Sequence, residues 1–191
     1  MQYSLFGTMK ELYVVRHAEL DEEGTPTPAG IACAQAVGAL LPRFDVVISG
    51  GDAATDQTAM AMSGRENTVD CWAGMSPIFA NHEQEVWQYE QPPKKFSVSD
   101  YIEYSFADGT ISREVSRHAS GLRMLIYHTL YSLGDGQTGL IVSNGLCIMA
   151  AMYPMYLHKR PIKHCYGFLL QPPCSRETMK LFEPPEAKVS Y

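Results

Sequence analysis

The sequence has no run of basic residues, no hydrophobic stretch long enough to cross a membrane and no low-complexity tract or internal repeat. Acidic residues outnumber basic ones, 21 to 15, and the formal net charge is −6. A chain of this charge is poorly suited to binding nucleic acid or a membrane surface through many phosphate contacts. We also see no signal peptide or membrane span at the N-terminus. We therefore expect neither nucleic acid nor membrane as a partner.

Paired cysteines are also missing. The five cysteines are odd in number and scattered, with no CxxC or Cys/His spacing, so neither a disulfide framework nor a zinc site is indicated. Free thiols are typical of a cytosolic protein, and we expect a cytoplasmic location. The length of 191 residues fits one domain, 1–191, with room for a full hydrophobic core.

The stretch Leu12 to Glu19 is the most informative part of the chain. Four apolar residues, Leu12 to Val15, predict a strand that is buried on both faces, as in a parallel sheet. Arg16 and His17 follow at once, where open α/β sheets place their ligands. Arginine binds phosphate oxygens in a plane, and a neutral histidine can attack phosphorus. A surface arginine beside a structural histidine is the alternative interpretation.

Strands and helices alternate along the rest of the chain, which predicts βαβ units and a mostly parallel sheet. We expect a three-layer α/β sandwich with helices on both faces of the sheet. The segment 76–108 is irregular and proline-rich, and it is interpreted as a variable insertion. The expected strands are 45–49, 67–72, 139–143, 165–170 and 178–182, and the expected helices are 28–41, 53–62, one that starts at Ser112 and runs to about 133, and 145–153.

Four sequence blocks, in order, carry a resemblance to a known family. They are Val15-Arg16-His17-Ala18, Thr25-Pro26-Thr27-Pro28-Ala29-Gly30, Ser49 to Ala59, which contains Gln57-Thr58-Ala59, and Ile141-Val142-Ser143-Asn144-Gly145. Together they span roughly residues 11 to 182, and the combination is more specific than any single block. The sequence resembles the histidine phosphatase superfamily, also called phosphoglycerate-mutase-like.

The resemblance implies roles for individual residues. His17 matches the nucleophile that takes up the phosphoryl group, and Arg16 matches the first phosphate-binding arginine. Ser49 and Asn144 are expected to bind the ligand beside them. Glu83 is the candidate acid that protonates the leaving oxygen, with Glu85 as the fallback and a solvated acidic loop as the alternative. The chemistry implied needs no metal and no other cofactor, and its ligand is a small phosphorylated molecule or a phosphate-like anion.

Two positions depart from the family pattern. Ala54 stands where the family has its second arginine, and Asn144 where it has its second histidine. An asparagine keeps a neutral donor but carries no charge. Losing one preorganised donor to a developing oxyanion costs roughly 10²–10³ in rate. Weak catalysis is therefore expected, with the carboxylates of Asp52 and Asp56 repelling a phosphate dianion if they face the site.

Other cations are available to compensate. The candidates are Arg65, Arg113, Arg117, His118 and the Lys94-Lys95 pair. For Arg113 and Arg117 on the long helix, surface charge on an amphipathic helix is the alternative. The histidines outside the motifs are interpreted as structural or surface residues: His118, His128, His158 and His164.

Three functions stay open at the level of sequence. The first is a histidine-phosphatase-like protein that binds a phosphorylated ligand through Arg16 and His17 but turns it over poorly. The second is an active, diverged phosphatase or mutase that forms a phosphohistidine at His17. The third is a non-catalytic interaction or oligomerisation protein. The sequence names neither the substrate nor the oligomeric state, although an oligomer is possible.

Overall fold

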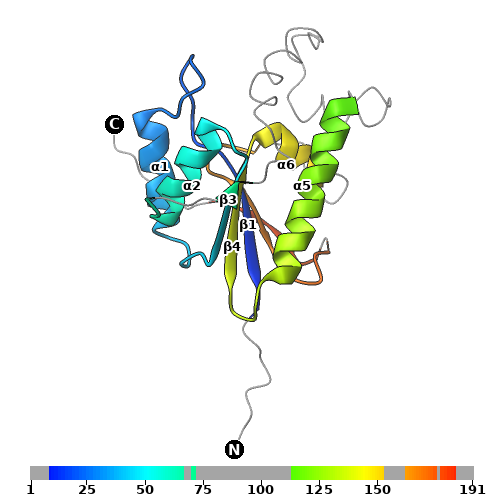
Figure 1. Cartoon of the computed structure of the whole chain (residues 1–191). Coiled ribbons are helices and arrows are strands. Elements are labelled where there is room, and N and C mark those ends of the chain that lie inside the picture. Colours follow the sequence, from blue (N-terminus) through cyan, green and yellow to red (C-terminus); the bar gives the residue numbers. More distant parts are fainter. Residues whose placement is uncertain (1–8, 67–69, 72–112, 153–161, 176, 184–191) are drawn as a thin grey trace, which may run out of the picture.

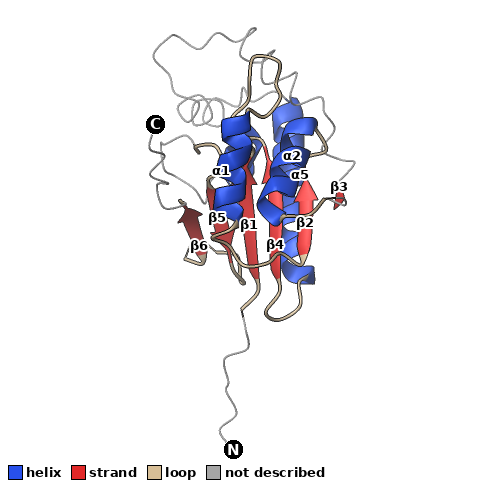
Figure 2. Ribbon diagram, turned by 90° about the vertical axis from the view of Figure 1, so that its left-hand side faces the viewer, coloured by secondary structure: helices blue, strands red, loops and turns tan. Residues whose placement is uncertain are grey.

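A single sheet lies between two helical layers in the computed structural model, which describes residues 9–66, 70–71, 113–152, 162–175 and 177–183 (Figures 1 and 2). Within these residues the sheet has six strands in the order β3-β2-β4-β1-β5-β6. The first four strands in that order run parallel, and β5 is antiparallel to both of its neighbours. The strands are β1 (Glu11–Arg16), β2 (Val46–Ser49), β3 (Asp70–Cys71), β4 (Thr138–Ser143), β5 (Gly167–Leu170) and β6 (Met179–Phe182).

Alternating side chains of β1 divide the core into its two halves. Tyr13 and Val15 pack with helices α1 (Pro28–Gly38) and α2 (Ala53–Ser63). Leu12 and Val14 pack with helices α5 (Arg113–Ser132) and α6 (Gly145–Met152) on the other face. Because both faces are covered, the central strands read as continuous apolar runs. The predicted three-layer α/β sandwich is confirmed (Figure 2).

Helix α1 begins where the sequence predicts but ends earlier. Thr27 is the N-cap, its side-chain oxygen accepts from the Gly30 amide, and Pro28 is the first helical residue. The helix ends at Gly38 rather than near residue 41, and Leu40 is 61% exposed. A side chain on Gly38 would lie 2.0 Å from the Met62 carbonyl oxygen. The close crossing with α2 therefore requires glycine at this position, and glycine is a weak helix former.

Other predicted boundaries shift by a residue or two. The strand expected over 165–170 begins at Gly167, because Cys165 has a positive φ of 61° that a regular strand does not allow. Only Asp70–Cys71 of the strand expected over 67–72 lies within the described residues. The long helix is confirmed, and over the part whose side chains are described, from Ala119 to Leu133, it buries an apolar face. The predicted insertion at 76–108, the predicted helix start at Ser112 and the predicted helix end at Tyr153 lie outside the described residues.

Among the helices that the structure describes, none has the length and apolar character to cross a membrane.

The N-cap of α1 provides a test of the fold. Replacing Thr27 by alanine removes the acceptor of the Gly30 amide and should lower the free energy of unfolding by about 1 kcal/mol. Thr27→Ser keeps a hydroxyl acceptor and should stay within a few tenths of the wild-type value. Urea denaturation followed by circular dichroism measures both. Equal losses in the two variants would show that the hydroxyl does not cap the helix.

Candidate active site

The carboxyl ends of β1, β4 and β2 meet at one edge of the sheet, uppermost in Figure 1. In the parallel register Arg16 lies opposite Ser143, and Ser49 lies opposite Val142. His17 and Asn144 each follow directly after their strand, and the His17 amide donates to the Ser143 carbonyl over 3.0 Å. The predicted convergence of Arg16, His17, Ser49 and Asn144 is therefore confirmed. Their roles toward a ligand remain predictions.

Arg16 is held against the start of helix α6. Its Nη1 donates to the Ile162 carbonyl over 2.8 Å. A side chain on Gly145 would lie 2.9 Å from Cδ and 3.0 Å from Nε of Arg16. The glycine that follows Asn144 is thus required for the arginine stem to pass, which gives a physical reason for glycine in this motif. The guanidinium is fixed by its surroundings before any ligand arrives.

His17 is only 4% exposed, and its ring is oriented by the backbone. Its Nδ1 lies 2.8 Å from the Ala18 carbonyl oxygen. A carbonyl can only accept, so Nδ1 carries the hydrogen and the lone pair of the neutral ring is on Nε2. Burial lowers the pKa of His17 to about 4, and the charge of Arg16 and the ring of His164 add to this effect. The imidazole is therefore neutral at physiological pH, the state that a nucleophile needs.

The first turn of α2 is tied to the loop after His17 by Thr58. The buried Thr58 hydroxyl donates to the Ala54 carbonyl over 2.6 Å and accepts from the Ala18 amide over 3.0 Å. Ala54 is one turn earlier on the same helix and is also buried. Position 54 thus lies on the side of α2 that faces His17, as the family pattern predicts. The Gln-Thr-Ala motif contains Thr58, but the sequence did not show this tethering role.

Two carboxylates stand beside the site. Asp52 is the N-cap of α2, where its side chain accepts from the Thr55 amide over 2.8 Å, and it acts electrostatically on His17. Asp56 accepts a short hydrogen bond from the Ser49 hydroxyl. The Ser49 oxygen also accepts from the Gly51 amide over 3.3 Å. Ser49 therefore shapes the loop between β2 and α2 and directs its hydroxyl hydrogen to Asp56.

Asn144 acts as the N-cap of helix α6. Its Oδ1 accepts from the Cys147 amide over 2.8 Å, and its carbonyl accepts from the Ile148 amide over 3.1 Å. An asparagine is well suited to this position because its short side chain reaches the unpaired amides of the first turn. With Oδ1 used in this way, the amide nitrogen is the group of Asn144 left to donate to a ligand.

His164, which the sequence indicates only as a structural or surface residue, lies beside His17 in the structure. Its Nδ1 lies 3.2 Å from the His17 carbonyl oxygen, and the two rings are 5.6 Å apart between centroids. The cause is the antiparallel pairing of β1 and β5, which continues past Arg16: the Cys165 amide donates to the Arg16 carbonyl over 3.0 Å. No motif in the sequence signals this pairing.

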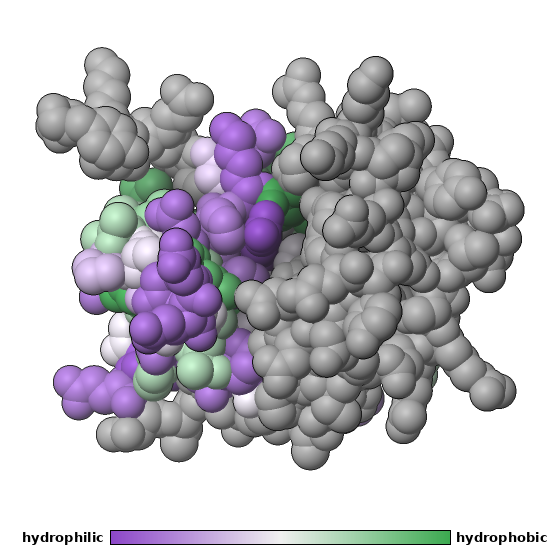
Figure 3. All heavy atoms as spheres, turned by 90° about the horizontal axis from the view of Figure 1, so that it is seen from above, coloured by the Kyte–Doolittle hydropathy of each residue, from purple (hydrophilic) through white to green (hydrophobic). Residues whose placement is uncertain are grey.

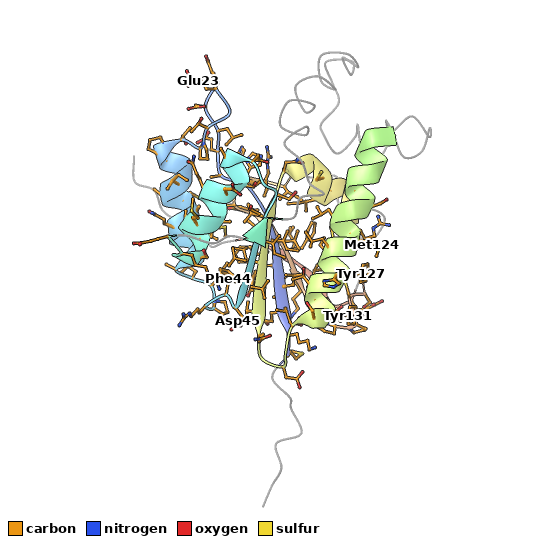
Figure 4. The ribbon with its side chains drawn as sticks, in the orientation of Figure 1. Glu23, Phe44, Asp45, Met124, Tyr127 and Tyr131 are labelled. Atoms are coloured by element: carbon orange, nitrogen blue, oxygen red, sulfur yellow. The ribbon has the colours of Figure 1, made fainter. Side chains whose placement is uncertain are left out.

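The other candidate cations do not all reach this edge. Nη2 of Arg65 donates to the carbonyls of Phe44 and Asp45, at the start of β2, which lies at the opposite edge of the sheet (Figure 4). Arg65 therefore does not replace the missing arginine. Glu83, Glu85 and the Lys94-Lys95 pair lie outside the described residues, as do the side chains of Arg113 and Arg117.

Seen from above, a group of hydrophilic residues crosses the described part of the carboxyl edge (Figure 3). The loop after β1 rises over this edge, with Glu23 near its tip (Figure 4). Within the described ranges, no cluster of three or more His, Cys, Asp or Glu side chains is arranged to hold a metal ion.

No protein-family model and no curated protein sequence match this chain. Solved structures do match it. Phosphoglycerate mutase from Bacillus anthracis is 15% identical, with a TM-score of 0.59 over 94% of this chain and 93% of that chain. Phosphoserine phosphatase from Entamoeba histolytica, in complex with 3-phosphoglyceric acid, is 17% identical, with a TM-score of 0.53 over 94% of this chain and 98% of that chain.

A mycobacterial glucosyl-3-phosphoglycerate phosphatase is 13% identical, with a TM-score of 0.51 over 90% of this chain and 96% of that chain. These neighbours are members of the histidine phosphatase superfamily. The chain shares their fold over almost its whole length, so the phosphoglycerate-mutase-like fold expected from the four motifs is confirmed.

The buried neutral state of His17 predicts a pH dependence of stability. The unfolded chain binds a proton at His17 below about pH 6.5, whereas the folded chain does so only below about pH 4. Between these values the unfolded state binds more protons, so stability falls as the pH falls, by at most about 1.4 kcal/mol per pH unit from this residue. His17→Gln should remove this contribution.

The measurement is urea denaturation of wild type and variant at several pH values. The variant should gain stability relative to the wild type as the pH falls through this window. His128→Gln is the matched control, because His128 is exposed on α5 and meets water in both states. A difference between wild type and His17→Gln that stays constant with pH would show that His17 is not buried as a neutral ring.

Proposed function

We propose that this protein binds a small phosphorylated molecule at the carboxyl edge of its sheet, through Arg16 and His17, and hydrolyses it weakly through a phosphohistidine at His17. The observation that carries the proposal is the pairing of a fixed guanidinium with a neutral imidazole whose Nε2 holds the lone pair. The structural neighbours support it, since their names include phosphatases of phosphoserine and of glucosyl-3-phosphoglycerate.

The reaction proceeds in two displacements. Nε2 of His17 attacks phosphorus in line, the bond from phosphorus to the ester oxygen breaks, and that oxygen leaves with a proton from a carboxylic acid, for which Glu83 remains the candidate. Water then attacks phosphorus and gives a proton to the carboxylate formed in the first step, the bond from phosphorus to Nε2 breaks, and phosphate is released. Arg16 neutralises charge on the phosphoryl oxygens in both steps, and such positioning and charge stabilisation supply most of the catalysis in phosphoryl transfer.

Three features of the site favour weak turnover. Ala54 contributes no donor, Asn144 spends its carbonyl oxygen on capping α6, and Asp52 and Asp56 bring negative charge to the edge that would hold a dianion. Coulomb repulsion between these carboxylates and a phosphate dianion would offset part of the attraction between the dianion and Arg16. Binding therefore tolerates the changes better than catalysis does, because the transition state needs every oxygen to be stabilised.

Anion binding should depend on the space beside Gly145. Gly145→Ala places a methyl 2.9 Å from Cδ of Arg16 and displaces the guanidinium. Because a charge-assisted hydrogen bond is worth about 1.5–3 kcal/mol, the affinity for inorganic phosphate should fall on the order of tenfold or more. Isothermal titration calorimetry measures this.

Gly134→Ala is the matched control for that experiment. Gly134 is exposed at the other edge of the sheet, and the added methyl would meet only the end of the Gln137 side chain. The control should bind phosphate as the wild type does. An unchanged affinity in Gly145→Ala, with the variant folded, would contradict the placement of the phosphate beside Arg16.

Catalysis should be weak in the wild type and recoverable by two substitutions together. Hydrolysis of p-nitrophenyl phosphate by the wild type should fall well below the usual enzyme range of about 1–10³ per second. Ala54→Arg with Asn144→His should raise the rate on the order of 10²-fold or more, and each single change far less, because both new side chains would hold the same phosphoryl group.

Two controls make the result interpretable. His17→Ala in the double variant should abolish the gain; a gain that persists would exclude His17 as the nucleophile. Urea denaturation of Asn144→His should be measured alongside, since this change removes the cap of α6. Ordinary turnover by the wild type would instead favour the active, diverged phosphatase, with a replacement cation from outside the described residues.

A further inference from the structure

His164 lies beside the nucleophile but outside every recognised motif. It precedes β5 in the chain, is half-buried, and places its Nδ1 3.2 Å from the His17 carbonyl oxygen. The carbonyl only accepts, so Nδ1 carries a hydrogen and the neutral ring keeps its lone pair on Nε2. The ring centroid is 5.6 Å from that of His17. At this distance from His17, the His164 ring would interact electrostatically with the negative charge of a phosphoryl group bound beside His17.

The groups around His164 have opposite effects on its protonation. Burial and the positive charge of Arg16 favour the neutral ring and lower its pKa. The carbonyls of His17 and Ala18 and the carboxylate of Glu19 favour the protonated ring. The neutral ring of His17 lies beside these groups, 5.6 Å from His164 between ring centroids. A dianion bound at Arg16 would bring two negative charges near His164, which would favour the protonated ring and raise its pKa.

We propose that His164 is a second histidine of the anion site, which takes up a proton from solvent as the phosphoryl group binds and supplies part of the positive charge that Ala54 and Asn144 leave out. The proton adds to Nε2, while Nδ1 keeps its hydrogen on the His17 carbonyl. This inference rests on the proposed function, because it concerns the same ligand. It makes ligand binding a proton-linked event.

The proposal separates a charge role from a tethering role. A residue that only tethers the loop after β1 would need the Nδ1 hydrogen and nothing more. His164→Asn keeps an amide donor near the place of Nδ1 but cannot be protonated. His128→Gln, on the exposed side of α5, removes a histidine without touching the site. The two variants therefore isolate the protonation of His164.

Sulfate is the probe, since it remains a dianion while the histidine titrates. Calorimetric titration of the full chain between about pH 8 and about pH 6 gives the affinity, and repeating it in buffers of different ionisation enthalpy gives the number of protons taken up. Wild type and His128→Gln should bind more tightly as the pH falls, by up to about tenfold per pH unit. His164→Asn should lose most of this slope and the proton taken up with it.

Each outcome bears on a stated claim. An unchanged slope and proton uptake in His164→Asn, with sulfate still bound, overturns this inference and leaves the proposed function standing. Absence of sulfate binding by the wild type at every pH overturns both. If the variant does not fold, NMR titration of the His164 ring in the wild type, with and without sulfate, tests the same point. The ring should become protonated at a higher pH when sulfate is present. A titration that sulfate does not shift overturns the proposal.

Discussion

The parallel pairing of β1 with β4 is the constraint on which the site depends. It sets Arg16 opposite Ser143 and so places the arginine stem over Gly145, where a Cβ would lie 2.9 Å from Cδ of Arg16. Side chains alternate between the two faces of a sheet, so a slip of one residue would turn Arg16 toward the other helical layer. Such a slip would also exchange Leu12 and Val14 with Tyr13 and Val15 between the two halves of the core, and so disturb the packing of both.

The fold was largely predictable because its signals are local. Buried parallel strands read as short apolar runs, and Pro28 directly after Thr27 marks where α1 begins. The features of the fold that could not be predicted depend on contacts between segments that are distant in the sequence. Helix α1 ends at Gly38, where α2 crosses it closely, and Met62, which makes that contact, is 24 residues further along the chain.

The site was predictable to the extent that its residues end or follow strands. Arg16, His17, Ser49 and Asn144 belong to this group, and the structure brings them together. His164 does not, since it reaches the site only through an antiparallel pairing with a strand about 150 residues earlier. The partner of the Ser49 hydroxyl was likewise hidden, because it depends on how α2 is tilted against β2.

Thr58 links the start of α2 to the loop after β1, in addition to the core contacts that Ala18 and Ala59 share. One hydroxyl holds the first turn of α2 through Ala54 and the loop after β1 through the Ala18 amide. Thermal displacements of the start of the helix and of the loop after His17 should therefore be correlated. Any change at the start of α2 is then transmitted mechanically to the histidine, whether or not the new side chain touches the ligand.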